Sequence, residues 1–520
     1  MDSIVAARGT SIGGALARAA RRHGDRVALR YARREWSFAA LNQAARRVAG
    51  RLRDLGLRPG DRVAAFGRNS DAYVVAWLGC AVGGFIHVPV NYALTGEELA
   101  YILGQSGARL VLRDGDLAGV LDSVGDGVAV EWTGSFADGA ATGGAAFDAL
   151  AVALDPTAPE HEGAAVEADT VAQLLYTSGT TAAPKGAMMT HGGLLAEYQS
   201  AIHDCRFSGA DRALAALPLY HSAQMHVFLM PQLMVGAMTL LIQAPALKSC
   251  LELIEAHRVT SFFAPPTVWV GLLRHADFDA HDLGSLEKLY YGASIMPVPV
   301  LQELRRRLPN ARPFNCYGQS EIGPLATVLS PEEHEARPAS AGRPVLNVET
   351  RVVDPDMNDV PVGQQGEIIH RSPQLMIGYW GKEKETAEAF SGGWFHSGDV
   401  GVLDADGYLT IVDRIKDVIN TGGVLVASRE VEEALYTHPA VAEVAVVALP
   451  DLKWIEAVAA FVVLREGRSA DAEELIAHCR AHLAPFKLPK QVHFVDALPR
   501  NTAGKLLKRE LRRAYADAAS

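Results

Sequence analysis

A run of hydroxyl-bearing residues follows directly on an apolar segment in QLLYTSGTTAAPKGAMMTH, residues 173–191. Hydroxyls and free backbone amides on a glycine-containing loop can hold phosphate oxygens, and a nearby lysine can neutralise charge that develops there. By composition alone, the same run fits a Ser/Thr-rich surface loop equally well. The phosphate-binding interpretation involves Thr177, Ser178, Gly179, Thr180, Thr181 and Lys185.

The same segment is not an ordinary P-loop. That motif places glycine immediately before its lysine and serine or threonine immediately after it. Here Pro184 precedes Lys185 and Gly186 follows it. A phosphate loop of another type is therefore expected.

A second segment, FNCYGQSEIG at residues 314–323, offers an aromatic ring and a carboxylate close together. The face of Tyr317 can stack on a purine, and the carboxylate of Glu321 is a hard oxygen ligand that suits Mg2+. A glutamate in a loop is usually only solvated. The interpretation of Glu321 as a metal ligand therefore depends on the motif that contains it.

Together, YTSGTTxxPKG and the motifs that follow it in order resemble the AMP-forming acyl-CoA synthetases of the adenylate-forming superfamily. The resemblance spans nearly the whole chain. It implies an enzyme that uses ATP and Mg2+ to convert a carboxylic acid to its acyl-adenylate and then transfers the acyl group to coenzyme A. One departure is Ala182, which stands where the family usually has glycine. Because a left-handed alanine costs ~1–2 kcal/mol, we expect a loop conformation that alanine tolerates.

The resemblance also assigns roles to residues of the nucleotide site. Glu321 and Thr177 would hold the metal, Asp399 in GGWFHSGDVG would accept hydrogen bonds from the ribose hydroxyls, and Arg414 in VDRIKD would contact ribose or phosphate. Without the motifs, Asp399 would be an ordinary turn residue and Arg414 a surface cation. The other implied ATP/AMP-binding residues are Ala293, Ser294, Tyr317, Gly318, Gln319 and Ser320, beside the loop residues above.

The implied catalytic residues are Lys185, Lys505 and His221. Lys505, in LPRNTAGKLLKREL, would lie between the substrate carboxylate and the α-phosphate, where a cation is worth ~3–4 kcal/mol. Alone, it would look like the start of a solvated basic helix. His221, in LPLYHSAQMH, fits a positioning or gating group better than a general base, because the acid is already ionised at neutral pH. It could also be a satisfied core histidine.

The segment INTGGVLVASREVEEAL bears on the thiol step. Gly422 and Gly423 would allow the pantetheine arm to approach closely, and Lys416 matches the family's hinge residue. Val424 and Leu425 replace the acid and amide that the family often has. An acyl carrier protein therefore stays possible as the acceptor in place of coenzyme A.

The acid substrate is less well defined. Residues 213–243 contain no Asp or Glu for a substrate ammonium, and APPTVWVGLL is apolar up to Arg274, so it offers no cation for a second carboxylate. Our hypothesis is a hydrophobic monocarboxylic acid, with a medium- or long-chain fatty acid ahead of an aryl acid. The residues that suit such a pocket, or could be plain core, are Met225, Val227, Ala264, Gly271, Gly292 and Ala293, with Met225 and Gly292 favoured.

The order of apolar and amphipathic segments predicts the fold class α/β. We expect a large N-terminal domain of layered sheets and helices, residues 1–413, and a small mobile α+β C-terminal domain, residues 414–520. VAAFG, FIHVPV and ARLVLR fit strands, and DADGYLTIV fits a hairpin with an Asp-Gly turn. SREVEEALYTHP fits a capped helix, and residues 114–167 fit a loose surface excursion.

Composition limits the partners. The formal net charge of −11 argues against nucleic acid, which needs a basic face. Five scattered cysteines without paired spacing predict reduced thiols in a cytoplasmic protein, and the amino terminus has no apolar secretion segment. Residues 227–242 are too short for a membrane span and contain Pro231 and Gln232, so we expect them to be buried, with a membrane-contacting patch as the alternative. A non-catalytic relative that binds nucleotide or acyl groups is the remaining class.

Overall fold

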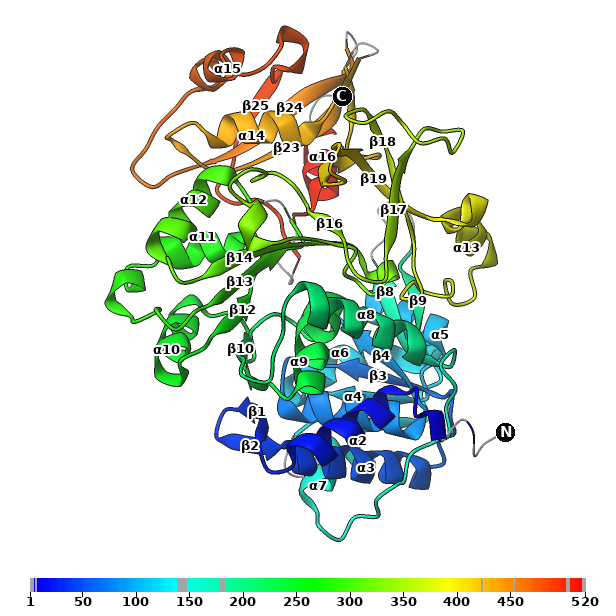
Figure 1. Cartoon of the computed structure of the whole chain (residues 1–520). Helices are drawn as coiled ribbons and strands as arrows, with labels where there is room; N and C mark the ends of the chain where they lie inside the picture. Colours follow the sequence, from blue (N-terminus) through cyan, green and yellow to red (C-terminus); the bar gives the residue numbers. More distant parts are fainter. Residues whose placement is uncertain are drawn as a thin grey trace.

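The computed structural model describes residues 4, 7–137, 147–177, 183–294, 296–421, 424–451, 454–501 and 506–516. Their strands form four sheets (Figure 1). Three belong to a large N-terminal domain and one to a smaller C-terminal domain, which confirms the predicted fold class.

The first sheet is mostly parallel and has the order β7-β6-β5-β3-β4-β8-β9. Its strands are β3 (Arg62–Phe66), β4 (Ile86–Val90), β5 (Leu110–Arg113), β6 (Trp132–Ser135), β7 (Phe147–Asp148), β8 (Val171–Thr177) and β9 (Lys185–Thr190). The segments VAAFG, FIHVPV and ARLVLR are therefore strands, as their apolar runs predict. The final pair, β8 and β9, is antiparallel, so the phosphate-loop segment joins two paired strands.

The expectation of a loose excursion over residues 114–167 is wrong. Within it, β6 and β7 extend the sheet in parallel, and α7 (Ala149–Leu154) contacts α3 (Phe38–Asp54) and α4 (Asp71–Gly83). Phe136 and Phe147 are buried in the same core as α3 and α4. Two anchoring aromatics among many small residues give a weak sequence pattern, so the strands became evident only in the folded chain.

The second sheet has the order β16-β15-β14-β13-β12-β10-β11-β1-β2. Its strands are β1 (Val27–Tyr31), β2 (Arg34–Ser37), β10 (Arg212–Ala215), β11 (Met238–Leu241), β12 (Ser261–Phe263), β13 (Lys288–Gly292), β14 (Arg312–Tyr317), β15 (Thr327–Leu329) and β16 (Arg343–Pro344). The six strands from β14 to β1 run parallel, so their carboxyl ends lie at one edge.

Helices cover both sheets. Apolar residues of α10, α11 and α12 pack with β13, while α2, α3 and α4 contact one another, and every residue of α4 is buried. Further bounds are α2 (Ile12–His23), α5 (Gly96–Ser106), α6 (Ala118–Asp122), α8 (His191–Asp204), α9 (Met230–Val235), α10 (Leu247–His257), α11 (Pro266–Arg274), α12 (Val298–Arg307) and α13 (Glu383–Ala389). Residues 227–242 are largely buried between these elements, and no helix within the described ranges is long and apolar enough to cross a membrane.

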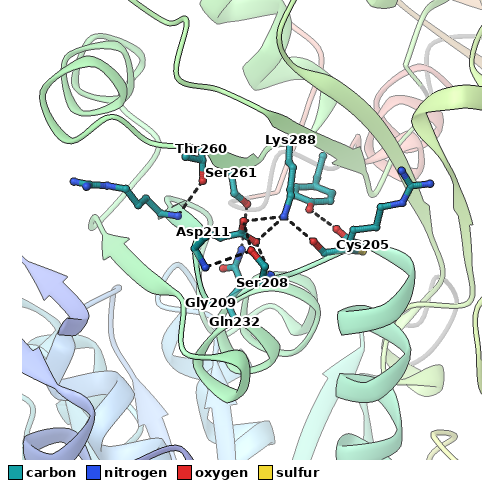
Figure 2. A network of polar contacts seen from close by, with 12 residues as sticks. Cys205, Ser208, Gly209, Asp211, Gln232, Thr260, Ser261 and Lys288 are labelled. Atoms are coloured by element: carbon teal, nitrogen blue, oxygen red, sulfur yellow. Dashed lines mark hydrogen bonds and ion pairs between the residues drawn. The ribbon is translucent and has the colours of Figure 1, made fainter. Parts of the chain in front are cut away.

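A polar network fixes the amino end of β13, opposite the end where the site lies (Figure 2). The ammonium of Lys288 donates to both carboxylate oxygens of Asp211 at 2.8 Å and to the carbonyl of Arg206 at 2.6 Å. Tyr290 donates to the carbonyl of Cys205 at 2.6 Å. These bonds fix β13 to the segment between α8 and β10.

The third sheet is antiparallel, with the order β17 (Glu349–Val353), β18 (Gln365–Arg371), β19 (Phe395–Leu403) and β20 (Leu409–Arg414). Strands β19 and β20 are the predicted hairpin, and Gly407 takes a positive φ of 80° in its turn. The fourth sheet contains β21 (Ile419–Thr421), β22 (Val424–Val426), β23 (Val441–Asp451), β24 (Ile455–Leu464) and β25 (Gln491–Phe494), with helices α14 (Ser428–Tyr436), α15 (Ala472–Arg480) and α16 (Lys508–Ala516).

The predicted capped helix α14 forms, and its cap comes from outside the segment. The residue at its N-cap, Ala427, makes no side-chain hydrogen bond. Instead, the backbone amide of Ser428 donates to the carboxylate of Asp413 at 2.6 Å. The cap therefore comes from β20, fifteen residues earlier in the chain.

Candidate active site

The candidate site lies where strands of the first two sheets end. Thr177 ends β8, Gly292 ends β13 and Tyr317 ends β14. The short helix η5 (Ser320–Ile322), which follows β14, contacts both β8 and β9. The two predicted nucleotide motifs are thus brought together across the boundary between two sheets, at the edge where α/β proteins commonly bind ligands.

Tyr379 links the lysine of the phosphate-loop segment to the candidate metal ligand. The ammonium of Lys185 lies 5.0 Å from the centre of the Tyr379 ring, and the hydroxyl of that ring donates to Oε1 of Glu321 at 3.1 Å. Burial and Glu321 both raise the pKa of Tyr379, so its hydroxyl keeps its proton. The sequence reasoning missed Tyr379; the only signal was an aromatic pair in MIGYW, residues 376–380.

The 376–380 segment is held against β9 by backbone hydrogen bonds. The amide of Trp380 donates to the carbonyl of Gly186 at 2.8 Å, and Met376 donates to the carbonyl of Glu321 at 2.8 Å. Thr177 and Lys185 are partners in the β8–β9 register, so they face each other at the base of the intervening loop. The segment therefore positions Lys185 and Glu321 from one rigid support.

The residues present fit a magnesium ion that is shared with phosphates. Glu321 is 8% exposed and presents one carboxylate, and the hydroxyl of Thr177 stands at the loop base. Within the described part of the chain, no group of three or more His, Cys, Asp or Glu side chains forms a protein-only cage. Mg2+ commonly uses one or two carboxylates and completes its shell with water and substrate phosphates.

Tyr317, Asp399 and Arg414 form a second polar cluster, at the carboxyl end of β14. The hydroxyl of Tyr317 donates to Oδ2 of Asp399 at 2.7 Å, while Nε of Arg414 lies 3.0 Å from Oδ1. Asp399 and Arg414 are direct partners between β19 and β20. The amide of Asp399 also donates to the hydroxyl of Ser397 at 3.1 Å. Each carboxylate oxygen can accept a further bond, so Asp399 can bind a vicinal diol while it stays paired.

The remaining residues of the YGQSE motif are also fixed. The hydroxyl of Ser320 shares a 2.8 Å hydrogen bond with the hydroxyl of Ser222. The side-chain amide of Gln319 donates to the carbonyl of Ser397 at 3.2 Å. A side chain on Gly318 would place its Cβ 1.9 Å from the carbonyl oxygen of Pro324. Glycine is therefore needed there for close packing of the loop.

The predicted adenine segment ends β13 and leaves it in an unusual conformation. Ala293 has a φ of +62°, a region that non-glycine residues seldom occupy and that clusters at functional sites. Ala293 and Ser294 are exposed. Gly292 instead has a packing role, because a Cβ there would lie 2.2 Å from the carbonyl oxygen of Cys316.

His221 precedes a π-helix, Ala223–Leu229, that continues into α9. Its Nδ1 accepts the backbone amide of Ala223 at 3.4 Å, which orients the ring. Single π-turns occur frequently at functional sites. Met225, on this π-helix, is fully buried in the core of the first sheet, so packing alone accounts for it. Its place in an acyl pocket stays a prediction.

Comparison with known proteins decides the family. Residues 16–380 match the model described as AMP-binding enzyme, and residues 430–505 match the AMP-binding enzyme C-terminal domain. The chain belongs to the AMP-binding enzyme family. This confirms the resemblance to AMP-forming acyl-CoA synthetases, and the protein is an AMP-forming CoA ligase that uses ATP, Mg2+ and coenzyme A.

This AMP-binding enzyme is similar to CoA ligases that are named for different acids. A feruloyl-CoA synthase from an Amycolatopsis species is 35% identical over 98% of this chain and 100% of its own length. A long-chain-fatty-acid–CoA ligase from Escherichia coli O6:H1 is 33% identical over 92% of this chain and 89% of its own. The crystal structure of the anthranilate CoA ligase AuaEII with anthranoyl-AMP superimposes with a TM-score of 0.91 at 26% identity, covering 98% of both chains.

In this AMP-binding enzyme, Lys416 lies in a tight turn between the third and fourth sheets. The amides of Asp417 and Val418 both donate to the carbonyl of Arg414, at 2.9 and 3.1 Å. Strand β20 before the turn pairs with β19, whereas β21 after it pairs with β22 and β24. The chain thus leaves one sheet and enters another within a few residues, where a hinge would need to be.

Some predicted site residues lie outside the described residues. They are Ser178, Gly179, Thr180 and Thr181, the departure Ala182, the two glycines Gly422 and Gly423, and Lys505. Their roles stay predictions.

Proposed function

We propose that the Tyr317–Asp399–Arg414 cluster and the Lys185–Tyr379–Glu321 line form the two walls of one ATP site. The adenine would stack on Tyr317, the ribose would donate to Asp399, and the triphosphate would run toward Lys185. The main support is Tyr379, because its ring faces Lys185 and its hydroxyl bonds to Glu321. Tyr379 thus holds the ammonium of Lys185 and the carboxylate of Glu321 near each other. This arrangement can bind a triphosphate together with its magnesium ion.

In the proposed first step, a carboxylate oxygen of the acid attacks the α-phosphorus of ATP in line. A new P–O bond forms, the bond to the bridging oxygen breaks, and pyrophosphate leaves with that electron pair. No proton has to move, because the acid is already ionised. Magnesium held by Glu321 and Thr177 would supply positive charge to the triphosphate, Lys185 would meet the charge of the departing group, and Lys505 would act between the two reacting anions.

In the proposed second step, the small domain turns about residues 413–416 and gives a thiol access to the acyl-adenylate. The thiol loses its proton, its sulfur attacks the acyl carbonyl, and the C–O bond to AMP breaks. Coenzyme A is the acceptor, as in this family. A carrier-protein thiol is the alternative acceptor to test against it, because Val424 and Leu425 are 45% and 68% exposed where the family often has polar residues.

We infer that the acid is a hydrophobic monocarboxylic acid. Residues 213–243, which include the π-helix beside His221, carry no acidic side chain, and Arg274 at the end of α11 is exposed. A medium- or long-chain fatty acid is the first candidate. An aryl acid is the second, supported by the full-length similarity to a feruloyl-CoA synthase.

A substrate panel tests this function. Purified enzyme with ATP and Mg2+ would receive acetate, malonate, phenylalanine, octanoate, palmitate, benzoate and ferulate, and pyrophosphate release would be measured for each. We expect turnover with the hydrophobic monocarboxylates. Preference for acetate, malonate or phenylalanine would overturn the acid class. The best acid would then be offered with coenzyme A or with a phosphopantetheinylated carrier protein, and the faster acceptor identifies the thiol substrate.

A further inference from the structure

Helix α16 begins at Lys508, three residues after Lys505, and carries two inward cations one turn apart. Lys508 and Arg512 are separated by four positions, which places both on the same face of the helix. Their side chains are 16% and 28% exposed. By contrast, Arg509 and Arg513 on the same helix are exposed.

Lys508 reaches α14 through two short contacts. Its ammonium donates to the hydroxyl of Ser428 at 2.6 Å and lies 2.8 Å from Oε1 of Glu432. Glu432 is itself fixed, since Oε1 accepts the backbone amide of Val446 at 2.8 Å. Burial lowers the pKa of Lys508, but Glu432, Asp413 and Asp417 together raise it further, so the side chain stays charged.

The same helix is connected to both sides of the proposed hinge residue. Asp413, three residues before Lys416, accepts the amide of Ser428, whose hydroxyl accepts Lys508. Asp417, directly after Lys416, pairs with Arg512 at 2.5 Å. Helix α16 therefore binds Asp417 directly through Arg512. It is connected to Asp413 indirectly, through Lys508 and Ser428.

The chain on either side of residues 502–505 is also tied down. Arg500 and Leu506 form an isolated antiparallel bridge, and the amide of Leu507 donates to the carbonyl of Pro499 at 2.8 Å. Arg500 further pairs with Glu443 on β23 at 2.9 Å. The described residues on the two sides of positions 502–505 therefore pair with each other, and α16 begins two residues after Leu506.

We infer that Lys508 and Arg512 are positioning residues that couple the placement of Lys505 to the conformation of the turn at Lys416. Through them, helix α16, which follows the lysine segment, is bound directly to Asp417 and, through Ser428, to Asp413. This inference rests on the proposed role of Lys505 in adenylation. Removing either cation would let α16 shift relative to the hinge and would misplace Lys505 without touching the nucleotide.

The test separates the two half-reactions in the full-length enzyme. Lys508→Met and Arg512→Met would be compared with Arg509→Met and Arg513→Met, which remove the same charge from the exposed face of the helix. Acid-dependent pyrophosphate exchange reports adenylation, and thioester formation from supplied acyl-adenylate reports the second step. We expect exchange to fall about tenfold or more in the first pair, mainly in kcat, with thioester formation changed less than about threefold. Both control variants should match the wild type.

The Lys505→Ala variant distinguishes a failure of this inference from a failure of the proposed function. If Lys505→Ala leaves exchange intact, the proposed role of Lys505 is wrong. If it abolishes exchange but Lys508→Met and Arg512→Met do not reduce it, the coupling is wrong. Equal loss of both half-reactions would also overturn the coupling, because it would indicate general damage to the domain.

Two further variants guard against misfolding. Lys508→Arg keeps the charge and should restore most of the exchange activity lost in Lys508→Met. In the Lys505→Ala background, Lys508→Met should leave thioester formation from supplied acyl-adenylate unchanged, because that step does not use Lys505. A loss of thioester formation there would indicate damage to the domain and contradict action through Lys505.

Discussion

The hydroxyl of Tyr317 donates a 2.7 Å hydrogen bond to Oδ2 of Asp399, which joins the end of β14 to the middle of β19. Burial and the Asp399 carboxylate raise the pKa of Tyr317 well above its usual value, so the hydroxyl remains a donor. The bond orients the tyrosine ring and the carboxylate together. In the proposed site, adenine and ribose are thus bound by one hydrogen-bonded pair from two sheets.

Tyr317→Phe should weaken ATP binding and lower stability. Losing this hydrogen bond to a charged group should cost ~1.5–3 kcal/mol of folding free energy, and KM for ATP should rise because the ring and the carboxylate are no longer oriented together. Steady-state kinetics at saturating acid would measure it. Tyr290→Phe is the matched control, because it removes a buried hydroxyl that donates to the carbonyl of Cys205 and not to Asp399. A comparable rise in KM for the control would show that the effect is not local.

Gly318→Ala should damage both stability and adenylation. The added methyl group would lie 1.9 Å from the carbonyl oxygen of Pro324, which forces the YGQSE loop away from its position. Overpacking of this kind typically costs ~1–3 kcal/mol. Urea unfolding and pyrophosphate exchange would both be followed. Gly119→Ala, where a Cβ meets nothing within 4 Å, should leave both unchanged.

Glu197 should make stability fall as the pH rises. Its carboxyl is fully buried and accepts the side-chain amide of Gln374 at 2.8 Å, and burial raises the pKa of Glu197 well above its usual value. Above pH ~4.3 the unfolded chain loses this proton while the folded chain keeps it, so the free energy of unfolding decreases with pH. In Glu197→Gln this contribution is absent. Unfolding between pH 5 and 8 should show a shallower decline for the variant, and parallel curves would contradict it.

Two buried histidines should make stability fall on acidification. Nε2 of His226 donates to Oε1 of Gln173 at 2.6 Å, its Nδ1 accepts from the hydroxyl of Tyr198 at 2.8 Å, and burial lowers the pKa of His226 to about 3. Burial likewise lowers the pKa of His87 to about 3. Below pH ~6.5 the unfolded chain binds protons that the folded chain does not, so each site destabilises the fold by up to ~1.4 kcal/mol per pH unit.

His226→Asn should therefore lose stability less steeply between pH 6.5 and 4.5 than the wild type. Denaturant unfolding across this range gives the slope. His482→Asn, at an exposed position, serves as the control and should keep the slope of the wild type. An unchanged slope in His226→Asn would mean that another group controls acid unfolding.

The sequence by itself determined the local elements and the family. Apolar runs such as VAAFG and the Asp-Gly turn at Gly407 specify strands and a hairpin through interactions between neighbouring residues. The motifs around Lys185, Glu321 and Asp399 identified an adenylate-forming enzyme through their resemblance to a known family, since none of them alone distinguishes a site from an ordinary loop.

Only the tertiary structure decided which residues complete the site. Tyr379 lies 58 residues from Glu321 along the chain, and Asp413 caps a helix that its own segment does not contain. Strands β6 and β7 became evident through Phe136 and Phe147, which are buried beneath α3 and α4. Such contacts depend on which surfaces meet when sheets and helices pack, and no periodicity within a short window of sequence contains that information.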